Sequence, residues 1–375
     1  MADSIFKKII SGEVFAGILG GGTQSVLGLD FGASSLKIVQ LRKEKERAVL
    51  ETYGELSVGH YANIDTGRAA IISEDKMVGM IKDLVSESGV KATDVVASIS
   101  LKNSFVTMIT MPEMADAELA EAVPFEARRY IPVPMSEVDM DYWVVPKGFD
   151  VNETDFAAQK VGKAMSQVLL VAIHKNVTQQ YRKLVERAGL NPKNFEIEIF
   201  SSVRASLGRE LVPMLILDMG VASTKMTVVD YGIVRSVHSL DKGGQDITLA
   251  LSRSMGVDFA RAEKVKREIG LSDRPEHKEM VNVIAPVLDF IFSEAGRMAA
   301  DYRMKHGRSV SRVILVGGGA MLKGITDFAV NKFGVEVSLA NPFSKLDYPA
   351  FLEPALREIG PNFATAIGLA LREIR

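Results

Sequence analysis

The feature of this sequence that most constrains its fold is a short loop pattern that occurs twice. Asp, Gly, Ser and Lys stand at relative positions 0, 2, 5 and 7 in residues 30–37, and again in residues 218–225. Each copy lies between two apolar segments, which predicts a β-hairpin with a glycine-containing turn. A single Asp-x-Gly turn is common hairpin chemistry. Two copies in the same register indicate instead that the fold itself is duplicated.

The residue types in these turns predict a phosphate site. Glycine lets backbone N–H groups approach an anion without a β-carbon in the way. Serine hydroxyls donate to phosphate oxygens, and lysine adds a positive charge. Two such hairpins facing each other across a cleft would hold a polyphosphate from both sides. The residues expected to bind it are Gly32, Ser34, Ser35, Lys37, Gly220, Ser223 and Thr224.

An aspartate precedes each turn and predicts a divalent cation. The carboxylates of Asp30 and Asp218 would repel phosphate unless a cation, usually Mg²⁺ with its waters, lay between them. We therefore expect both aspartates to be metal ligands. Other phosphate motifs fit less well, because the sequence has no G-x-x-x-x-G-K-[ST] segment. The glycine run at 317–319 also lacks the third glycine of the dinucleotide-binding fingerprint.

The composition narrows the classes of function. The chain has 375 residues, 47% of them hydrophobic and 25% charged, which suffices for two domains with buried cores. It has no cysteine, which excludes disulfides, thiolate catalysis and cysteine-ligated zinc, and its five histidines lie singly. The net charge of −2 gives no support to nucleic-acid binding. Alternating strand-like and helix-like segments predict the α/β class.

The first 24 residues form an extension with three consecutive glycines, residues 20–22, near its end. An acidic residue, Glu13, interrupts its apolar stretch and argues against a secretory signal. A short docking helix or a tail fits better, and an interfacial membrane anchor is the alternative. One helical face of the extension carries Ile5, Phe6, Ile9 and Ile10.

Two facing hairpins of this kind resemble those of the actin superfamily, which implies ATP and Mg²⁺ as ligands. Gly243, Gly244 and Asp246 resemble the glycine pair and helix start between its domains, where amide groups can meet phosphate. Glu263 and Lys266 match an AExxK helix motif that contacts the ribose and base region. Residues 313–321 resemble the adenosine motif, with Gly317, Gly318, Gly319 and Met321 expected at the base.

Within that superfamily the chain resembles the PilM family of type IV pilus assembly proteins from about residue 25 onward. The similar segments include LGLDFGASSLKIVQL at 27–41, GGQDIT at 243–248 and VGGGAMLKG at 316–324. The most family-specific segment is EAVPFEARRYIPVP, Glu121–Pro134, which other actin-like proteins lack. The resemblance implies an actin-like, duplicated ribonuclease-H-like fold with an inserted α+β subdomain between the two hairpins.

These features divide the chain into four parts. The extension covers 1–24, and the first actin-like domain covers 25–55 and 175–212. The inserted subdomain covers 56–174, and the second actin-like domain covers 213–375.

The resemblance implies a cytoplasmic ATP-binding assembly protein, peripheral at the inner membrane through its partners. The expected partner is the N-terminal cytoplasmic tail of a PilN-like single-span membrane protein, held between the core and the inserted subdomain. Pilus motor ATPases and further copies of the chain are additional candidates, and nucleic acid is not. Nucleotide occupancy would shift the interdomain geometry rather than drive turnover.

A competing hypothesis is an ATPase with slow, Mg-dependent turnover. Hydrolysis in this fold needs a residue that orients water, and Glu198, helped by Asp218, is the catalytic candidate. A surface carboxylate on an alternating strand explains Glu198 equally well. Lys225 stands where the family more often has a neutral residue, so it either contacts phosphate or is simply exposed.

Two further functions fit less well. An FtsA-like protein of cell division or polymer formation is the alternative on the same fold. The chain stops directly after its last domain helix, whereas FtsA-like proteins typically end in an amphipathic membrane helix. A small-molecule kinase would need a general-base aspartate beside the first hairpin, and no such motif is visible.

Overall fold

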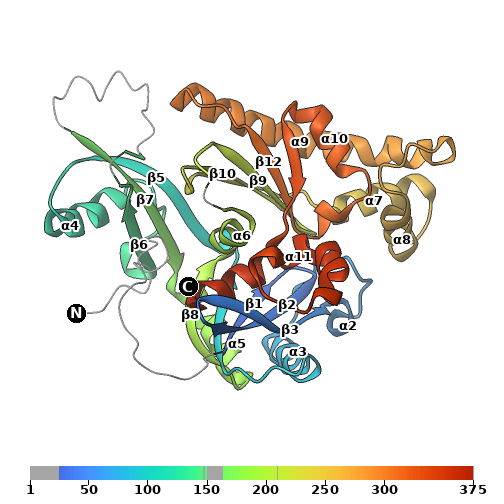
Figure 1. Cartoon of the computed structure of the whole chain (residues 1–375), viewed down its shortest axis with the longest axis horizontal. Coiled ribbons are helices and arrows are strands. Elements are labelled where there is room, and N and C mark those ends of the chain that lie inside the picture. Colours follow the sequence, from blue (N-terminus) through green and yellow to red (C-terminus); the bar gives the residue numbers. More distant parts are fainter. Residues whose placement is uncertain (1–24, 147, 150–163, 209, 375) are drawn as a thin grey trace.

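The computed structural model describes residues 25–374 with the exception of 147, 150–163 and 209. Two five-stranded sheets and one three-stranded sheet form its framework (Figure 1). The predicted N-terminal extension, residues 1–24, lies outside the described residues. Within the described part of the chain, no helix is long and apolar enough to cross a membrane.

The first sheet contains the first hairpin. Strands β1 (Ser25–Phe31) and β2 (Ser35–Glu44) pair antiparallel, and β3 (Arg47–Ser57) continues the meander. Strands β4 (Asp94–Ile99) and β8 (Asn191–Ile197) extend the other edge in parallel, which gives the order β3-β2-β1-β4-β8. Strands β1 and β4 are buried over most of their length, because elements pack on both faces of the sheet.

The second sheet repeats this arrangement strand for strand and confirms the predicted duplication. Its meander consists of β9 (Met214–Met219), β10 (Thr224–Asp230) and β11 (Ile233–Leu240). Strands β12 (Arg312–Val316) and β13 (Glu336–Leu339) add in parallel, in the order β11-β10-β9-β12-β13. The two hairpins therefore occupy equivalent places in equivalent sheets.

The third sheet belongs to an inserted subdomain, which projects to the left of the two large sheets in Figure 1. It consists of β5 (Ser104–Pro112), β6 (Val138–Val144) and β7 (Met165–His174), paired antiparallel in the order β5-β7-β6. Helix α4 (Asp116–Ala127) packs against it through Leu119, Val123 and Ala127. The sheet is thus inserted in the chain between β4 and β8 of the first sheet.

The strand pairing corrects one part of the predicted division. The inserted subdomain was expected to cover 56–174, a range that includes β4. Because β4 pairs with both β1 and β8, it is an interior strand of the first sheet, and the inserted sheet begins only at β5. The other bounds of the division stay a prediction.

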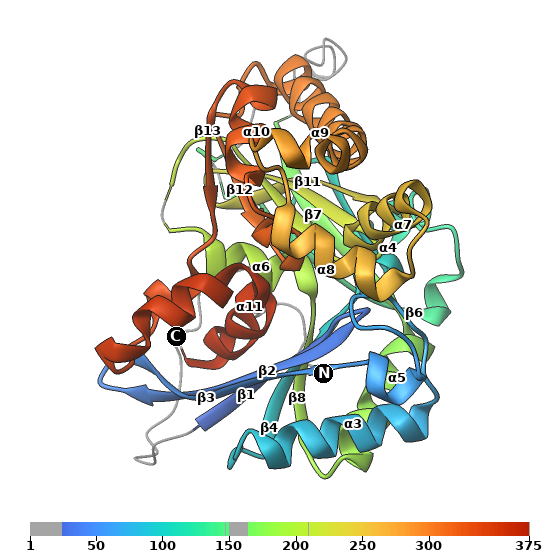
Figure 2. The same cartoon turned by 90° about the vertical axis from the view of Figure 1, so that its right-hand side faces the viewer.

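Helices cover the faces of the two large sheets (Figure 2). The described α-helices besides α4 are α2 (Gly59–Ala62), α3 (Glu74–Glu87), α5 (Lys175–Arg187), α6 (Glu198–Ser206), α7 (Gly244–Met255), α8 (Phe259–Ile269), α9 (Lys278–His306), α10 (Ile325–Phe333) and α11 (Glu353–Ile374). Helices α3 and α5 lie on the outer side of the first sheet, and α9 packs across the outer side of the second.

Helices α6 and α11 lie between the two large sheets. The side chains of β9 point alternately to the two faces of the second sheet. Leu215 and Leu217 belong to the apolar cluster that contains α9, whereas Met214 and Ile216 belong to the cluster that contains α6 and α11. The same cluster contains Leu27 and other apolar residues of the first sheet. Helix α11, in the predicted second domain 213–375, therefore packs on the first sheet as well as on the second.

Candidate functional site

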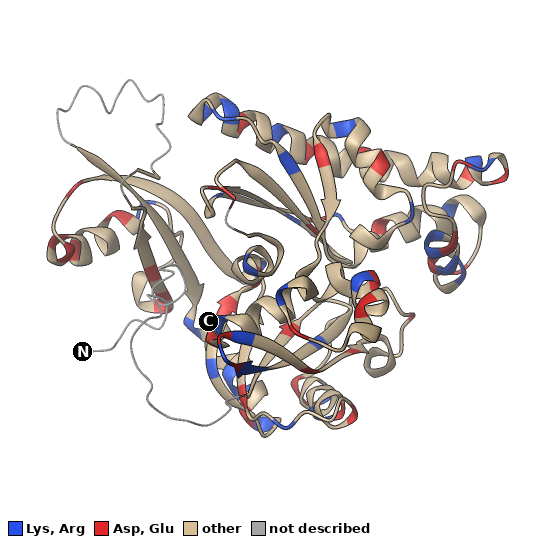
Figure 3. Ribbon diagram, in the orientation of Figure 1, with Lys and Arg blue, Asp and Glu red and all other residues tan. Residues whose placement is uncertain are grey.

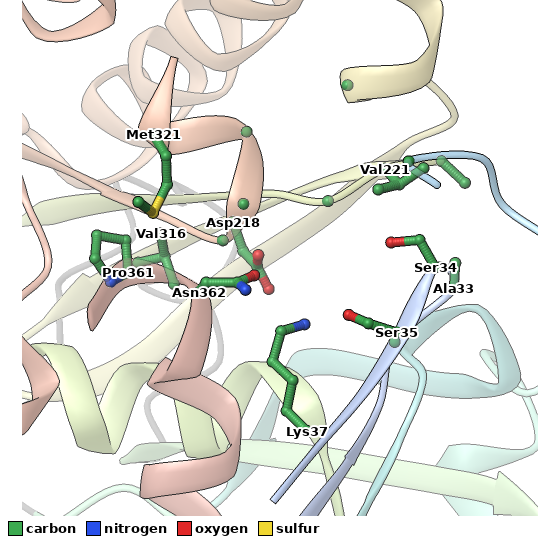
Figure 4. A pocket seen from close by; sticks show the side chains of 18 of the residues that line it. Ala33, Ser34, Ser35, Lys37, Asp218, Val221, Val316, Met321, Pro361 and Asn362 are labelled. Carbon is green, nitrogen blue, oxygen red and sulfur yellow. The ribbon is translucent and has the colours of Figure 1, made fainter. Parts of the chain in front are cut away.

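A cavity of about 560 Å³ lies between the turns of the two hairpins. Figure 4 shows Ser34 and Ser35 on one side of it and Asp218 and Asn362 opposite, with Lys37 pointing in between them. The predicted site residues that line this cavity are Asp30, Gly32, Ser34, Ser35, Lys37, Glu198, Asp218, Gly220, Ser223, Gly244, Glu263, Lys266, Gly317, Gly318, Gly319 and Met321.

The first hairpin places a carboxylate and an ammonium group side by side at this cavity. Asp30 and Lys37 are directly opposite each other in the β1–β2 register. The Oδ1 atom of Asp30 accepts a hydrogen bond of 3.0 Å from the Ser98 hydroxyl, which itself accepts one of 2.8 Å from the backbone N–H of Phe31. Burial raises the pKa of Asp30 to about 6, although the charge of Lys37 opposes the shift.

The second hairpin repeats this pairing with Asp218 and Lys225. Its turn is closed by a hydrogen bond of 3.0 Å from the N–H of Gly220 to the carbonyl of Ser223. Burial raises the pKa of Asp218 above the usual range of an aspartate, although the charge of Lys225 opposes the shift. Each hairpin therefore presents one buried acid and one lysine to the same cavity.

The lysine of the second hairpin is not a surface residue. The Nζ atom of Lys225 lies 2.9 Å from Oε2 of Glu198 and 4.0 Å from Oδ2 of Asp218, and its side chain is only 13% exposed. Burial alone would lower the pKa of Lys225, but the charges of Glu198 and Asp218 prevail and raise it. Lys225 is therefore charged, and the expectation that it could simply be exposed is wrong.

Glu198 is the first residue of α6 and is buried. Its Oε1 atom accepts hydrogen bonds from the N–H of Leu101 at 2.9 Å and from the hydroxyl of Ser100 at 3.2 Å, while Oε2 faces Lys225. The start of a helix also favours a negative charge. Only 8% of the surface of Glu198 is exposed, so the interpretation of Glu198 as a surface carboxylate is wrong.

Three residues predicted to bind the cofactor do not line the cavity. The Asp246 carboxylate accepts a hydrogen bond of 2.9 Å from the N–H of Gly243, and the Thr224 hydroxyl donates one of 2.8 Å to the carbonyl of Lys242. The N–H of Gly244 donates to the Gly220 carbonyl at 2.9 Å. The polar groups at the start of α7 thus cap the helix and hydrogen-bond to the second turn. Thr224, Gly243 and Asp246 are therefore used in these local contacts and are absent from the lining.

Helix α8 contributes an ion pair that is itself held in place. The Nζ atom of Lys266 lies 2.6 Å from Oε2 of Glu263, and the hydroxyl of Thr248 lies 2.6 Å from the same oxygen. Although burial opposes it, the charge of Lys266 lowers the pKa of Glu263. Burial lowers the pKa of Lys266. The predicted AExxK pair therefore forms a hydrogen-bonded, polar part of the cavity wall.

The glycine run after β12 lies against the second hairpin. Gly317 has φ of +83°, and a β-carbon there would lie 2.5 Å from Oδ1 of Asp218. At Gly319 a β-carbon would lie 2.8 Å from the Cβ atom of Met219. Only glycine fits these positions, so the run brings its backbone against Asp218 and keeps that side of the cavity open.

Several lining residues were missed by the sequence analysis. Glu55 lies opposite Lys37 in the β2–β3 register and accepts a hydrogen bond of 2.6 Å from the Ser35 hydroxyl. Asn362 of α11 donates to the other oxygen of Glu55 at 3.0 Å. The register of the three-strand meander could have identified Glu55, but Asn362 and Gly67 come from distant segments that carry no local signal. Arg267 was also missed, although it follows Glu263 by one helical turn.

The residues around the cavity suit a magnesium ion that keeps most of its waters. In the described part of the chain, no three or more His, Asp or Glu side chains form a group that could hold a metal by themselves. Mg²⁺ in polyphosphate sites is commonly held by one or two carboxylates, substrate oxygens and water. Asp30 and Asp218, both buried and both lining the cavity, match that donor set.

Two equivalent sheets around a cavity formed by two glycine hairpins define the actin-like class. Solved structures share this fold, among them EutJ from Carboxydothermus hydrogenoformans, with a TM-score of 0.54 and 16% identity over 97% of this chain and 94% of that one. MreB5 of Spiroplasma citri bound to AMPPNP has a TM-score of 0.52 and 11% identity, over 94% of this chain and 96% of that one.

Within this class the chain belongs to the type IV pilus assembly protein PilM family, whose model matches residues 28–374. The structure of a PilM-PilN type IV pilus biogenesis complex is similar to it, with a TM-score of 0.77 and 27% identity, over 93% of this chain and 98% of that one. The cell division protein FtsA of Neisseria meningitidis serogroup B is 23% identical over 347 residues, which cover 84% of this chain and 80% of FtsA. The likeness to FtsA is more distant, so the pilus assignment is the better one.

Proposed function

We propose that this chain binds Mg-ATP between its two hairpins and acts as an assembly protein of the type IV pilus inner-membrane platform. The observation that carries the proposal is the presence of two Asp–Lys pairs, Asp30 with Lys37 and Asp218 with Lys225, at one cavity. Its volume, about 560 Å³, lies within the usual range for small-molecule sites.

The proposal gives each wall of the cavity a role. The turn residues and Lys37 would bind the phosphates, and Asp30 and Asp218 would hold Mg²⁺, which neutralises phosphate charge. The pair Glu263 and Lys266 would face the ribose and base, together with the glycine run of residues 317–319. No general-base aspartate is needed for this function.

The proposed partner is the cytoplasmic tail of a PilN-like single-span membrane protein, bound between the core and the inserted subdomain. The chain would then work in the cytoplasm, at the inner membrane through this partner. Support comes from the solved PilM-PilN complex that this chain resembles.

The contacts of Glu198 offer a route by which nucleotide could affect that partner. Glu198 lines the cavity, and it also accepts hydrogen bonds from Ser100 and Leu101, in the short connection between β4 of the first sheet and β5 of the inserted subdomain. A change in charge around Glu198 would therefore bias the position of the inserted sheet. We infer a shift between conformations rather than work driven by fast turnover, and any hydrolysis would be slow.

Nucleotide binding is tested by titrating purified protein with ATP and Mg²⁺ in a calorimeter. Asp30→Ala and Asp218→Ala should each weaken binding at least about tenfold, the value of one charge-assisted contact. The control is Asp273→Ala, which removes an exposed aspartate distant in sequence from both hairpins. Unchanged affinity in both site variants would refute a shared nucleotide site.

Partner binding is tested by titration with the tail peptide of a PilN-like protein, with and without Mg-ATP. We expect binding whose affinity differs between the two conditions, and we expect Glu198→Gln to reduce that difference. Absence of heat in both conditions would count against the partner. Rapid phosphate release without any partner would count against an assembly role.

A further inference from the structure

Lys225 occupies an unusual place in the proposed site. Its ammonium group lies between two carboxylates, 2.9 Å from Glu198 and 4.0 Å from Asp218. The side chains of the three residues are 13%, 10% and 13% exposed, and all three line the cavity. A lysine so placed is a fixed positive charge inside the site, because an unpaired buried charge is costly and this one has two partners.

The equivalent lysine of the first hairpin has a different environment. A β-carbon at Gly32 would lie 3.6 Å from Nζ of Lys37, and one at Gly220 would lie 3.7 Å from Nζ of Lys225, so both ammonium groups lie close to their own turns. The nearest acid to Lys37 is Glu55, at 3.7 Å, whose side chain is 39% exposed. Lys225 alone is held between buried acids of the cavity.

The charge balance of the cavity shows what Lys225 contributes. Beside the hairpins, three buried carboxylates, those of Asp30, Glu198 and Asp218, line it together with the lysines 37 and 225. The fourth buried acid of the lining, Glu263, has its own cations, Lys266 and Arg267. A polyphosphate adds further negative charge beside these acids, and cations must compensate it. If Lys225 were neutral, Glu198 and Asp218 would both lack their nearest positive partner, and a divalent ion would have to supply it.

We propose that Lys225 is a resident cation of the nucleotide site, which reduces the dependence of nucleoside triphosphate binding on Mg²⁺. The inference rests on the proposed nucleotide binding. Lys225 compensates Asp218 and Glu198 and attracts phosphate oxygens, and it competes with a metal for Asp218. All these effects reduce the advantage that Mg²⁺ gives to binding.

The test measures the dissociation constant of ATP in Mg²⁺ and in EDTA. The ratio of the constant in EDTA to the constant in Mg²⁺ is then compared between variants. We expect this ratio to be at least about tenfold larger for Lys225→Met than for the unaltered chain, the value of one charge-assisted contact. Lys225→Arg keeps the charge and should keep the ratio of the unaltered chain. Lys242→Met, beside the second hairpin on the surface, serves as the control.

Removing Lys225 leaves two buried acids without their partner and could unfold the chain. The double variant Lys225→Met/Glu198→Gln removes one charge of each sign, and it should fold and still show the enlarged ratio. Equal ratios in the unaltered chain, the folded variants and the control would overturn the inference but leave nucleotide binding intact. An unaltered chain that binds ATP in neither buffer would overturn the proposed function and the inference together.

Discussion

Gly67, in the first half of the chain, lies against the carboxylate of Glu263, in the second half. A β-carbon at residue 67 would lie 2.8 Å from Cδ of Glu263, and φ of Gly67 is +86°. Two residues later, the N–H of Ala69 donates a hydrogen bond of 3.2 Å to the side-chain carbonyl of Gln245. This segment joins the two halves on the side of the cavity where the ribose and base are proposed to bind.

Gly67→Ala should loosen this junction. The substitution strains the backbone and pushes against Glu263, at a cost of roughly 1–3 kcal/mol in the free energy of unfolding. We also expect weaker ATP binding, because Glu263 and its partner Lys266 line the cavity. Urea unfolding and calorimetry measure the two effects.

Gly79→Ala is the matched control for this prediction. Gly79 lies within α3, and a β-carbon there would meet no atom within 4 Å. Alanine at this helical position should stabilise the chain by up to about 1 kcal/mol and leave ATP binding unchanged. Equal effects of the two substitutions would contradict the role of Gly67.

Asp30 gives the stability a defined pH dependence. Its pKa is about 6 in the folded chain against an ordinary value of 3.8, so between these values the folded state binds more protons than the unfolded state. The stability that Asp30 contributes is thus fully present below about pH 4 and is lost as the pH rises through 6. As the pH rises over that interval, the free energy of unfolding of Asp30→Asn should increase relative to that of the unaltered chain. The increase should be roughly 2–3 kcal/mol, at 1.36 kcal/mol per pKa unit.

This difference is measured by urea unfolding without nucleotide at pH 4.5 to 7.5. Asp273→Asn, at an exposed position, should show a constant difference from the unaltered chain throughout. If the difference between Asp30→Asn and the unaltered chain did not change with pH, burial would not be raising the pKa of Asp30.

Arg204 of α6 and Glu196 of β8 form a buried ion pair. Both guanidinium Nη atoms of Arg204 contact the carboxylate, at 2.5 and 2.7 Å, and Nη1 also donates to the carbonyl of Gly368 in α11 at 2.8 Å. Glu196 is fully buried, so Arg204→Met leaves its charge without its main partner. We expect a cost of about 3–5 kcal/mol in urea unfolding.

An exposed pair provides the comparison. Arg187 lies beside Asp75 at 2.5 Å, with 46% and 85% of the two side chains exposed. Arg187→Met should therefore cost less than about 1 kcal/mol. Similar costs for Arg187→Met and Arg204→Met would mean that burial does not set the strength of the inner pair.

The local turns could be predicted from the sequence because their chemistry is local. Asp-x-Gly followed by serine and lysine specifies a hairpin within eight residues, and its repetition specifies a duplicated fold. The wrong predictions of cofactor ligands also have a local cause. Asp246 and Thr224 looked like ligands by their residue types, but each is used by neighbouring backbone groups as a cap or a turn contact.

What could not be predicted depends on how distant segments meet. Asn362 and Gly67 reach the cavity only because α11 and the loop after α2 fold back over it. The ion pair of Lys225 with Glu198 joins the two halves of the fold, and no spacing along the chain indicates it. Strand β4 was placed in the wrong subdomain because an apolar strand of six residues does not indicate which sheet it enters.

The last helix supplies the sharpest test of how the two halves are joined. A β-carbon at Gly368 would lie 1.9 Å from the carbonyl oxygen of Ser201 in α6, and one at Gly28 would lie 2.1 Å from the carbonyl oxygen of Ala366. Helix α11 thus touches α6 and β1 backbone to backbone at these glycines. Gly368→Ala forces α6 and α11 apart and should cost about 3 kcal/mol, the upper end for overpacked cores.

Gly296→Ala in α9 separates this effect from a general response to alanine in a helix. A β-carbon at Gly296 would meet no atom within 4 Å, so the substitution should be neutral or stabilise the chain by up to about 1 kcal/mol. Urea unfolding of both variants measures the difference. Because α11 also carries Asn362 and Thr365 of the cavity, Gly368→Ala should weaken ATP binding, whereas Gly296→Ala should not. A Gly368→Ala chain as stable as Gly296→Ala would show that α11 can move away from α6 at no cost, and the two halves would then not be joined through this helix.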